Sequence, residues 1–384
     1  MNLNLHTLIL SWAFPTALLG STLTVQTDAG GQLREKLSSN VALADTLIIS
    51  GILNAEDWKY LTEDAAVKAA VKTLDLKHAE FALDGAVYRS FASDAGSMGV
   101  TNRTEYAFWP TDSTSTRQTL EGGVTTIWGK HLAGAFRQTH FQHVKLPASL
   151  EALGECAFMN ASQLEGIEFG GCEKSIGNNA FAYCHSLKHL NLPSTTDSIA
   201  HEAFKEVPLE EIDLSCASRL GERLFQQNKV LRRVVLHPEL EKIQEKMFSE
   251  CTALETIVLP ASLRQIGAGA FSYCSSLATI ELPASLRTIS ARAFANCSAL
   301  KRIDLPQDIE EIGDAAFDDC RQLTQADIPE GLYRIGLGAF DDTPFLESLK
   351  TENGIRYIGR TAYELADKHI ASLAFKEGTA GISP

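Results

Sequence analysis

Apolar residues recur along most of this chain in a fixed order that returns about every 23 residues. One unit consists of Leu277, Ile280, Leu282, Pro283, Leu286, Ile289, Ala293, Phe294 and Cys297. The next unit carries Leu300, Ile303, Leu305, Pro306, Ile309, Ile312, Ala316, Phe317 and Cys320. A fixed period of this size is typical of stacked supersecondary units, so we predict a solenoid in which each unit forms one rung.

The first half of each unit predicts a short strand. Ile280 and Leu282 alternate with polar residues and are followed by Pro283. Alternation gives a strand one buried face, and proline ends its ladder because it has no N–H to donate. We therefore expect every rung to begin with a strand of about three to five residues.

The second half of each unit should turn the chain back toward the next rung. An aromatic residue recurs here, and we expect it to fill the core: Phe136, Phe158, Phe181, Phe204, Phe225, Phe248, Phe271, Phe294, Phe317, Phe340 and then Tyr363. A glycine such as Gly267, Gly313 or Gly336 suits the bend. Stacking buries an apolar set that one unit could not bury alone, so the array should fold as one body.

The repeats extend beyond the clearest units. Residues 120–127 align with residues 328–335, so we expect the solenoid to cover residues 114–384. Phe375 begins another turn, but the sequence stops at Pro384 before an Ala-Phe pair, so we predict an incomplete last rung. Truncation, trimming or a covering partner would each explain it.

The segment before the repeats follows a different pattern. Strand-like residues at 23–25, 47–49 and 74–76 alternate with helical patterns at 32–37 and 55–61. We predict an N-terminal capping module over residues 23–83, because the terminal units of a solenoid must cover its open end. Residues 84–113 have no period, and we expect an irregular loop whose aromatic residues pack on the cap or, alternatively, bind a ligand.

The repeat order resembles the BspA-like, treponemal-type leucine-rich repeat family. Its consensus is Leu-x-x-Ile-x-Leu-Pro-x-x-Leu-x-x-Ile-Gly-x-x-Ala-Phe-x-x-Cys, and residues 47–58 are similar to the N-terminal module of such proteins in gut bacteria. The resemblance implies an α/β-type solenoid of short parallel strands with an N-terminal α+β cap. It also implies a bacterial cell-surface or secreted protein that engages host or microbial ligands through its solenoid.

An apolar run precedes the capping module. It extends from Leu8 to Leu19 and is too short to span a bilayer, so residues 1–22 are predicted to be an export signal. No basic residue precedes this run, because the first one in the chain is Arg34, and a misassigned start is the alternative. Nothing later in the sequence predicts membrane insertion.

Composition narrows the range of partners. The chain is 45% hydrophobic and 21% charged, and its net charge is −14. A strongly acidic protein repels nucleic-acid phosphates and anionic membrane surfaces, so neither is expected as a partner. The length alone would suggest two or three domains, but the repeats predict one extended body with a cap.

The cysteines of the repeats occupy one position. Cys184, Cys251, Cys274, Cys297 and Cys320 each lie three residues after a ladder Phe. Neighbouring rungs are ~5 Å apart, which leaves disulfides possible on distance alone. Ala161, Val207, Asn228 and Thr343 fill the same position elsewhere, however, and this favours free, buried thiols.

No enzyme or cofactor site is predicted. His140 with His143, or Cys184 with His185 and His189, have spacings that could ligate zinc. His143 and His189 lie two rungs apart, at ~10 Å, which is too far for one zinc ion, so we expect solvated surface histidines. The sequence contains no Gly-rich phosphate loop, nucleophile elbow or zincin motif, so we expect no catalytic residue and no cofactor.

The solvent-facing positions of the strands supply the candidate binding residues. They are Glu281, Asp304 and Asp327, with Arg302 beside them and the apolar pair Val235 and Val258. Like charges at ~5 Å oppose one another in a sheet, so stability does not require this arrangement. The acids either keep the solenoid soluble or form a strip that contacts a basic segment of a protein, or a cation.

Three classes of function remain. We expect a non-catalytic extracellular binding or adhesion protein of the bacterial surface, with a protein or glycan ligand on the strand face. The alternative is a structural protein that forms homo-oligomers through its open C-terminal rung. An enzyme or enzyme inhibitor has no motif in its favour.

Overall fold

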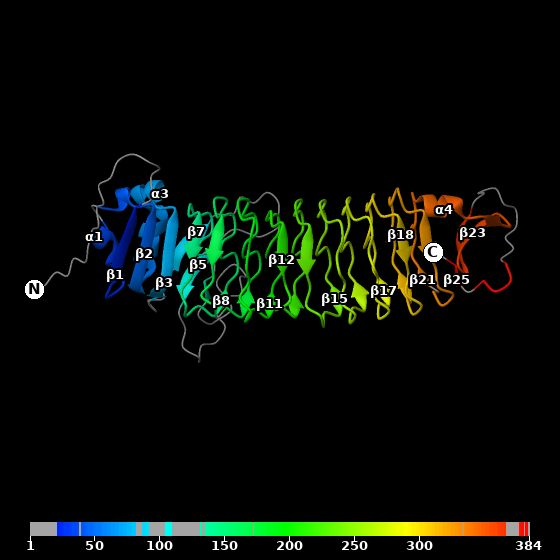
Figure 1. Ribbon diagram of the computed structural model, residues 1–384, viewed down its shortest axis with the longest axis horizontal. Coiled ribbons are helices and arrows are strands. Elements are labelled where there is room, and N and C mark those ends of the chain that lie inside the picture. The colour runs from blue at the N-terminus through cyan, green and yellow to red at the C-terminus, as the bar shows by residue number, and fades with distance from the viewer. Residues whose placement is uncertain are drawn as a thin grey trace, which may run out of the picture.

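The computed structural model describes residues 21–37, 40–81, 87–91, 104–109, 131–132, 135–171, 173–332, 334–365, 376–379 and 381–382. Its rungs stack along one long axis, and its helices lie near the two ends (Figure 1). The chain forms the predicted parallel-strand solenoid, with about 11 turns and a period of about 23 residues. The predicted export signal lies outside the described residues except for residues 21 and 22, and so does Phe375.

Three parallel strands begin the first sheet. They are β1 (Thr22–Thr27), β2 (Thr46–Leu53) and β3 (Thr73–Phe81), separated by α1 (Leu33–Leu37), the 3-10 helix η1 (Val41–Leu43), α2 (Ala55–Glu63) and α3 (Ala65–Ala70). Strand β3 pairs with β7 (His143–Lys145), which pairs with β9 (Gly166–Glu168). The sheet order is β1-β2-β3-β7-β9, so the N-terminal α+β region continues the sheet of the solenoid.

Two adjacent residues of α2 hold this region together. The buried carboxylate of Asp57 accepts hydrogen bonds from the backbone N–H groups of Gly31 (2.7 Å), Leu33 (2.8 Å) and Asn54 (3.0 Å). Trp58, also buried, donates from Nε1 to the carbonyl of Ala135 at 2.9 Å, and its ring meets Phe136 edge-on at 4.8 Å. Trp58 therefore covers the first ring of the phenylalanine ladder.

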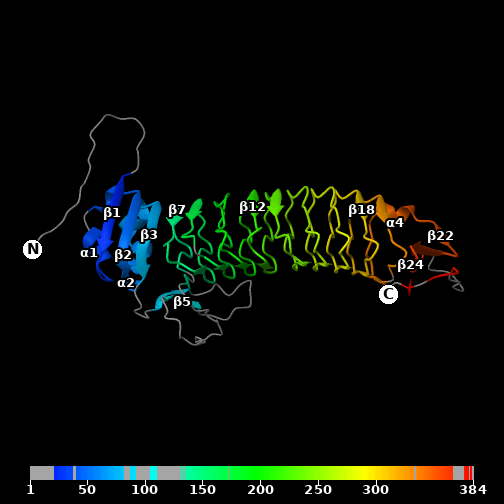
Figure 2. The ribbon, with the colours of Figure 1, turned by 60° about the horizontal axis from the view of Figure 1, so that its bottom comes forward.

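The region expected to be an irregular loop contains strands. Strand β4 (Val87–Phe91) pairs antiparallel with β5 (Thr104–Trp109), and β5 pairs antiparallel with β6 (His131–Leu132). The prediction for residues 84–113 is wrong for these two segments, which are rich in the aromatic and β-branched residues that favour strands. Figure 2 shows β5 beside the first rungs.

The predicted rung strands form one side of the solenoid, which we call the first face. After β7 and β9 they are β12 (Glu211–Asp213), β14 (Arg233–Val235), β18 (Arg302–Asp304) and β20 (Gln325–Asp327). Each has three residues centred on an inward apolar position. The corresponding segments at 188–192, 255–259 and 278–282 are not paired as strands, so the ladder on this face is interrupted.

A second set of strands forms the second face. They are β8 (Ala152–Leu153), β10 (Ser175–Ile176), β11 (Ser198–Ile199), β13 (Arg219–Leu220), β15 (Lys242–Ile243), β16 (Gln265–Ile266), β17 (Thr288–Ile289), β19 (Glu311–Ile312) and β21 (Arg334–Ile335). The sequence predicted only a returning chain here. The sheet runs from β4 through β6 to β13 and resumes at β15.

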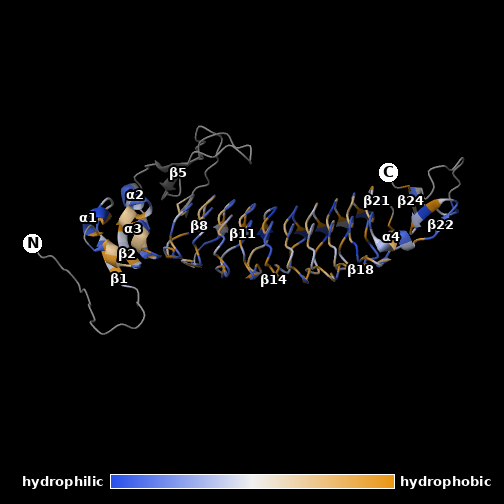
Figure 3. Ribbon diagram, turned by 90° about the horizontal axis from the view of Figure 1, so that it is seen from above, coloured by the Kyte–Doolittle hydropathy of each residue, from blue (hydrophilic) through white to orange (hydrophobic). Residues whose placement is uncertain are grey.

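The phenylalanine ladder is the axis of the core. All ten rings from Phe136 to Phe340 are fully buried. Adjacent rings are stacked, with centroids 4.4 to 5.7 Å apart. Hydrophobic and hydrophilic residues mix along every rung instead of separating into blocks of the array (Figure 3). The apolar residues of each rung are therefore buried by stacking on the adjacent rungs, as predicted.

Left-handed backbone flanks each ladder Phe. The residues two positions before and two positions after Phe271 are Gly269 (φ +60°) and Tyr273 (φ +61°), and the rungs from Phe158 to Phe340 repeat this pair. Gly267 and Gly313, predicted to supply the bend, do not have positive φ. That interpretation is wrong, because these glycines instead allow close contact: a Cβ on Gly313 would lie 2.4 Å from the nitrogen of Ala291, one rung back.

The cysteines of the ladder are free, as predicted. Each thiol donates a hydrogen bond to the carbonyl of the Phe in the preceding rung: Cys184 to Phe158 (3.0 Å), Cys251 to Phe225 (3.2 Å), Cys274 to Phe248 (3.1 Å), Cys297 to Phe271 (3.1 Å) and Cys320 to Phe294 (3.2 Å). Asn228 replaces the thiol in its rung and donates to the carbonyl of Leu209 at 3.0 Å. The position thus suits a small buried side chain, and cysteine or asparagine there also donates to a backbone carbonyl.

The C-terminal part leaves the repeat geometry. It contains α4 (Pro344–Ser348), β22 (Thr351–Glu352), β23 (Ile355–Ile358), β24 (Thr361–Leu365) and β25 (Gly381–Ile382). Strands β22, β23 and β24 are antiparallel, with left-handed Asn353 and Gly354 in the turn, and β25 pairs parallel with β24. The chain departs where Thr343 caps α4 and Pro344 occupies its first turn.

Tyr363 does not form the next rung of the ladder, so that prediction is wrong. Its hydroxyl accepts a hydrogen bond from the backbone N–H of Phe340 at 2.9 Å. In the preceding rung the equivalent N–H, on Phe317, donates to the carbonyl of Ala339 at 2.7 Å. A side chain thus replaces a backbone acceptor, and Phe345 packs on the ring of Phe340 with centroids 5.3 Å apart.

Candidate binding face

The six candidate residues lie on the first face, in five successive rungs. Val235 is on β14, Arg302 and Asp304 are on β18, and Asp327 is on β20. Val258 and Glu281 occupy the same outward position in the two rungs between β14 and β18, where no strand is paired. The structure therefore brings together the residues that the sequence pattern placed in one row.

Arg302 links two of the three acids. Its Nε lies 2.5 Å from Oδ1 of Asp304, and its Nη2 lies 2.7 Å from Oδ2 of Asp327. The hydrogen bond and the charge of Asp304, followed by the charge of Asp327, raise the pKa of the Arg302 guanidinium. All three side chains are exposed, so the cluster contributes little to stability, but it fixes the positions of two carboxylates.

Glu281 and Val258 are free for contact. Glu281 is exposed and has no ion-pair partner among the described residues. Val258 is 84% exposed, the highest value among the large apolar side chains that the structure describes as exposed, and Val235 is half-buried beside it. An apolar surface followed by carboxylates thus extends along the first face from Val235 to Asp327.

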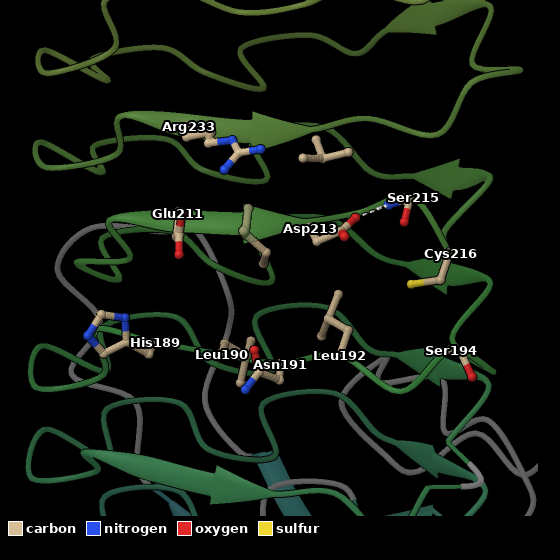
Figure 4. A pocket seen from close by; sticks show the side chains of 12 residues that line it. His189, Leu190, Asn191, Leu192, Ser194, Glu211, Asp213, Ser215, Cys216 and Arg233 are labelled. Atoms are coloured by element: carbon tan, nitrogen blue, oxygen red, sulfur yellow. Dashed lines mark hydrogen bonds between the residues drawn. The ribbon is translucent and has the colours of Figure 1, made fainter.

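A groove not predicted from the sequence lies at the start of this surface. It has a volume of about 480 Å³ and separates the rung of His189 from that of Glu211. Its lining consists of His189, Leu190, Asn191, Leu192, Ser194, Glu211, Ile212, Asp213, Ser215, Cys216, Arg233 and Val235. Figure 4 shows the outward side chains arranged along its length, with Glu211 directed toward the rung of His189.

The groove lies beside a short rung. Phe204 and Phe225 are 21 residues apart, whereas Phe181 and Phe204, like Phe225 and Phe248, are 23 apart. Backbone pairing across the groove begins with a 3.4 Å hydrogen bond from the N–H of Glu210 to the carbonyl of Lys188, and no strand pairing follows. Counting the intervals of the ladder could have located the short rung.

Two more hollows border the same rung. One, of about 290 Å³, lies at the corner formed by Val207 and Pro208. The other, of about 540 Å³, lies on the second face between β11, β13 and the residues before β15, where that sheet is interrupted. These three hollows all adjoin residues 204–224, as expected where the rung has a shorter contour.

The groove is polar at its rim and apolar at its floor. Leu190 and Ile212 are buried, whereas His189, Asn191 and Glu211 are exposed. Hydrogen bonds from the side chain of Ser215 and from its backbone N–H (2.8 Å) lower the pKa of Asp213, and the charge of Arg233 adds to this. The carboxylate of Asp213 is therefore already engaged.

Metal ligation and membrane insertion find no support in the part of the chain that the structure describes. No group of three or more His, Cys, Asp and Glu side chains there is arranged to hold a metal ion. His143 instead approaches Glu165, with Nε2 3.8 Å from Oε2. Among the described helices, none has the length and apolar character needed to cross a bilayer.

Comparison with known families gives one match. This family is described as the BspA type leucine rich repeat region. Six copies of its repeat match the chain, over residues 104–232 and 241–369. These ranges cover more than half of the chain. A search of curated proteins found no match to this chain.

A solved structure shows the same fold, and two others are similar in sequence. A leucine-rich repeat protein from Bacteroides ovatus is 21% identical and has a TM-score of 0.53, with 79% of this chain and 90% of that chain covered. A leucine-rich cell surface protein from Faecalibacterium prausnitzii is also 21% identical, with a TM-score of 0.34 over 60% and 85% of the two chains. A leucine-rich repeat protein of T. pallidum is 26% identical, with a TM-score of 0.34 over 47% and 78%.

Proposed function

The chain belongs to the BspA-type leucine-rich repeat family, and we propose that it is an exported, non-catalytic binding protein of the bacterial cell surface. Its ligand is a macromolecule that contacts the first face. The observation that carries this proposal is the surface from Val235 to Asp327, where an exposed apolar side chain adjoins carboxylates. Neither feature is needed to stabilise the solenoid.

The ligand that best fits this surface is a protein with a basic segment beside an apolar residue. Val258 offers apolar area, and Glu281 offers a carboxylate without a partner among the described residues. Asp304 and Asp327 each have one oxygen engaged by Arg302, and their remaining oxygens can accept further hydrogen bonds. A net charge of −14 also favours the approach of a cationic partner.

Surface plasmon resonance against a panel of immobilised extracellular matrix glycoproteins tests this proposal. For a glycoprotein that binds, we expect Asp304→Asn with Asp327→Asn to weaken binding about tenfold at low salt and less at high salt, because salt screens exposed charges. Arg302→Gln should strengthen binding, because it removes the only cation within reach of these two acids in the described part.

A second arginine with two carboxylates provides the control. Arg287 approaches Asp308 (3.1 Å) and Glu310 (4.0 Å), away from the first-face strands. The variant Asp308→Asn with Glu310→Gln changes the same charge and should leave binding unaltered. An affinity that Asp304→Asn with Asp327→Asn does not change at low salt would contradict the proposed role of the strip.

Self-assembly remains the alternative proposal. The ladder end at Phe340 is covered by Phe345 and Tyr363, so this rung offers no open apolar ring. Strand β25 is the outer strand of the C-terminal sheet, and Ile382 on it is 67% exposed. A mass that rises with protein concentration in light scattering, and that Ile382→Lys abolishes, would favour assembly over ligand capture.

A further inference from the structure

The groove at the short rung gathers four exposed polar side chains that make no hydrogen bond or ion pair among the described residues. His189, Asn191, Glu211 and Arg233 are all exposed, and none has a hydrogen-bond or ion-pair partner among the described residues. Glu211 and Arg233 are direct neighbours in the β12–β14 register, yet no salt bridge joins them. The charge of Arg233 helps to lower the pKa of Asp213, but no hydrogen bond or ion pair joins the two side chains. All four side chains can therefore still bind an external ligand.

Charged side chains on either side of the groove behave differently. Toward the N-terminus, Lys145 lies 3.5 Å from both Asp75 and Glu168. Toward the C-terminus, Arg302 joins Asp304 and Asp327. The first face thus neutralises its charges internally at both ends. What distinguishes this part of the face is that four side chains without such partners line one hollow, whereas Glu281 stands alone on the surface.

The size and lining of the groove indicate the kind of ligand. A volume of about 480 Å³ falls within the range of small-molecule sites, roughly 300–1,000 Å³. Glu211 only accepts hydrogen bonds, Arg233 only donates them, and Asn191 and His189 do both. Every hydroxyl of a sugar is both a donor and an acceptor, so vicinal hydroxyls match this set, while Leu190 and Leu192 provide apolar floor for the C–H faces of the ring.

The charges of the groove and of the whole chain favour a neutral ligand over an acidic one. Glu211 and Asp213 carry negative charge, Arg233 carries positive charge, and the whole chain is at −14. An acidic sugar would meet repulsion from the groove and from the molecule. A peptide is less suitable, since the groove lacks a deep apolar pocket for an anchoring side chain: only half-buried Leu192 and Val235 add to its buried floor.

We propose that this groove is a binding subsite for a neutral oligosaccharide, held by Glu211, Arg233, Asn191 and His189. The inference rests on the proposed function and names a glycan, carried by a surface glycoprotein or polysaccharide, as part of the ligand. The subsite lies on the same face as the acidic strip. Its groove meets the surface from Val235 to Asp327 only at Val235. One ligand can therefore contact both.

Ligand-observed NMR with the full chain and a panel of neutral tri- to pentasaccharides tests this inference. The panel contains cellotetraose, maltotetraose, a mannotriose and N-acetyllactosamine oligomers, with sialylated N-acetyllactosamine as the acidic counterpart. We expect weak binding of at least one neutral member, in the millimolar range or tighter, and weaker binding of the sialylated form. Because the ligand is uncharged, its affinity should change less than about twofold between low and high salt.

Two neighbouring glutamates provide a matched pair of variants. Glu211→Gln should lower the affinity about tenfold or more, since it removes a charged acceptor from the groove. Glu210→Gln makes the same chemical change one residue earlier, outside the lining of the groove, and should leave the affinity unchanged. Asn191→Ala should weaken binding in the same way as Glu211→Gln. Circular dichroism checks that each variant is folded.

The outcomes are distinct from those of the proposed function. Absence of binding by every neutral member overturns the inference, as does equal loss in Glu210→Gln and Glu211→Gln. Preference for a lysine-containing peptide over all sugars overturns it in favour of a peptide groove. None of these results affects the acidic strip, because Asp304→Asn with Asp327→Asn reports on the strip separately.

Discussion

At the scale of the residue, the thiol ladder shows why cysteine recurs at one position of the rung. Each ladder cysteine is enclosed by its own rung and donates to a carbonyl of the preceding one. Serine would place a more polar group in the same apolar surroundings, and alanine would leave the carbonyl without its donor. Cysteine is small, weakly polar and able to donate, which explains its recurrence.

Burial makes these thiols unreactive. It raises the pKa of Cys320 to about 12 and that of Cys297 well above its ordinary value. The thiolate is the reactive form, so at pH 8 the ladder should not react in the folded protein. Burial also raises the pKa of Cys216, but this side chain is only half-buried at the groove, so it is the one described cysteine that a reagent can reach.

Titration with a chromogenic disulfide reagent tests this, in a Cys172→Ser background that removes the cysteine outside the described residues. We expect about one thiol to react in the native protein at pH 8 and about seven in denaturant. Adding Cys216→Ser should abolish the native reaction. A denatured chain without free thiols would mean that the ladder is oxidised, and rapid reaction of the double variant would mean that the core is open.

At the scale of the element, the spacing between rungs is set by backbone contacts as much as by side chains. Gly313 has no positive φ, but a Cβ there would lie 2.4 Å from the nitrogen of Ala291 and 2.7 Å from the carbonyl carbon of Ser290. Backbone atoms cannot move aside as the end of a side chain can. Glycine at this position therefore permits close stacking of the second face.

Gly313→Ala should destabilise the protein by about 3 kcal/mol, as overpacking in a fixed space does. Gly331→Ala is its control, because a Cβ there meets only the carbonyl oxygen of Gln307, at 3.7 Å, and the change should stay within about 0.5 kcal/mol. Urea unfolding followed by circular dichroism measures both. Equal effects of the two substitutions would show that rung spacing is not limited at Gly313.

These elements also show what the sequence could predict. Period and alternation predicted the strands of the first face, the Phe stack and the N-terminal strands, because each follows from a repeated burial pattern. The two-residue strands of the second face were missed: Thr288 and Ile289 are too few for an alternation to register. The role of Gly313 was misjudged because a sequence shows that a side chain is absent but not which atoms come close.

At the scale of the whole molecule, stacking makes each departure from the period visible on the surface. A rung of 21 residues beside neighbours of 23 has less chain to follow the same contour, so its hollows appear on several sides at once. The interval between Phe204 and Phe225 was present in the sequence. Its consequence could not be predicted, because the depth of a groove depends on whether neighbouring strands keep their pairing.

The C-terminal end concentrates the acidity of the molecule. Asp318, Asp319, Asp341 and Asp342 lie in two adjacent rungs, and Arg321 engages Asp319. Burial, followed by the charges of Asp342, Asp319 and Asp341, raises the pKa of Asp318 above its ordinary value of 3.8. Burial and nearby acids likewise raise the pKa of Asp341, against the lowering effect of the Tyr363 hydroxyl.

A raised pKa in the folded state gives a defined dependence of stability on pH. Between the ordinary pKa of Asp318 and its raised value, the folded protein holds a proton that the unfolded chain has released, so stability falls as pH rises through this window. Asp318→Asn removes this loss. The variant should be more stable than the wild type at pH 7, with a higher urea midpoint. It should match the wild type near pH 3, where Asp318 is protonated in both the folded and the unfolded state.

Asp341→Asn should show the same dependence on pH as Asp318→Asn. The double variant should gain less stability than the sum of the two single variants, because each substitution removes the charge that repels the other acid. A gain for Asp318→Asn at pH 3 as large as that at pH 7 would assign the effect to packing rather than to charge.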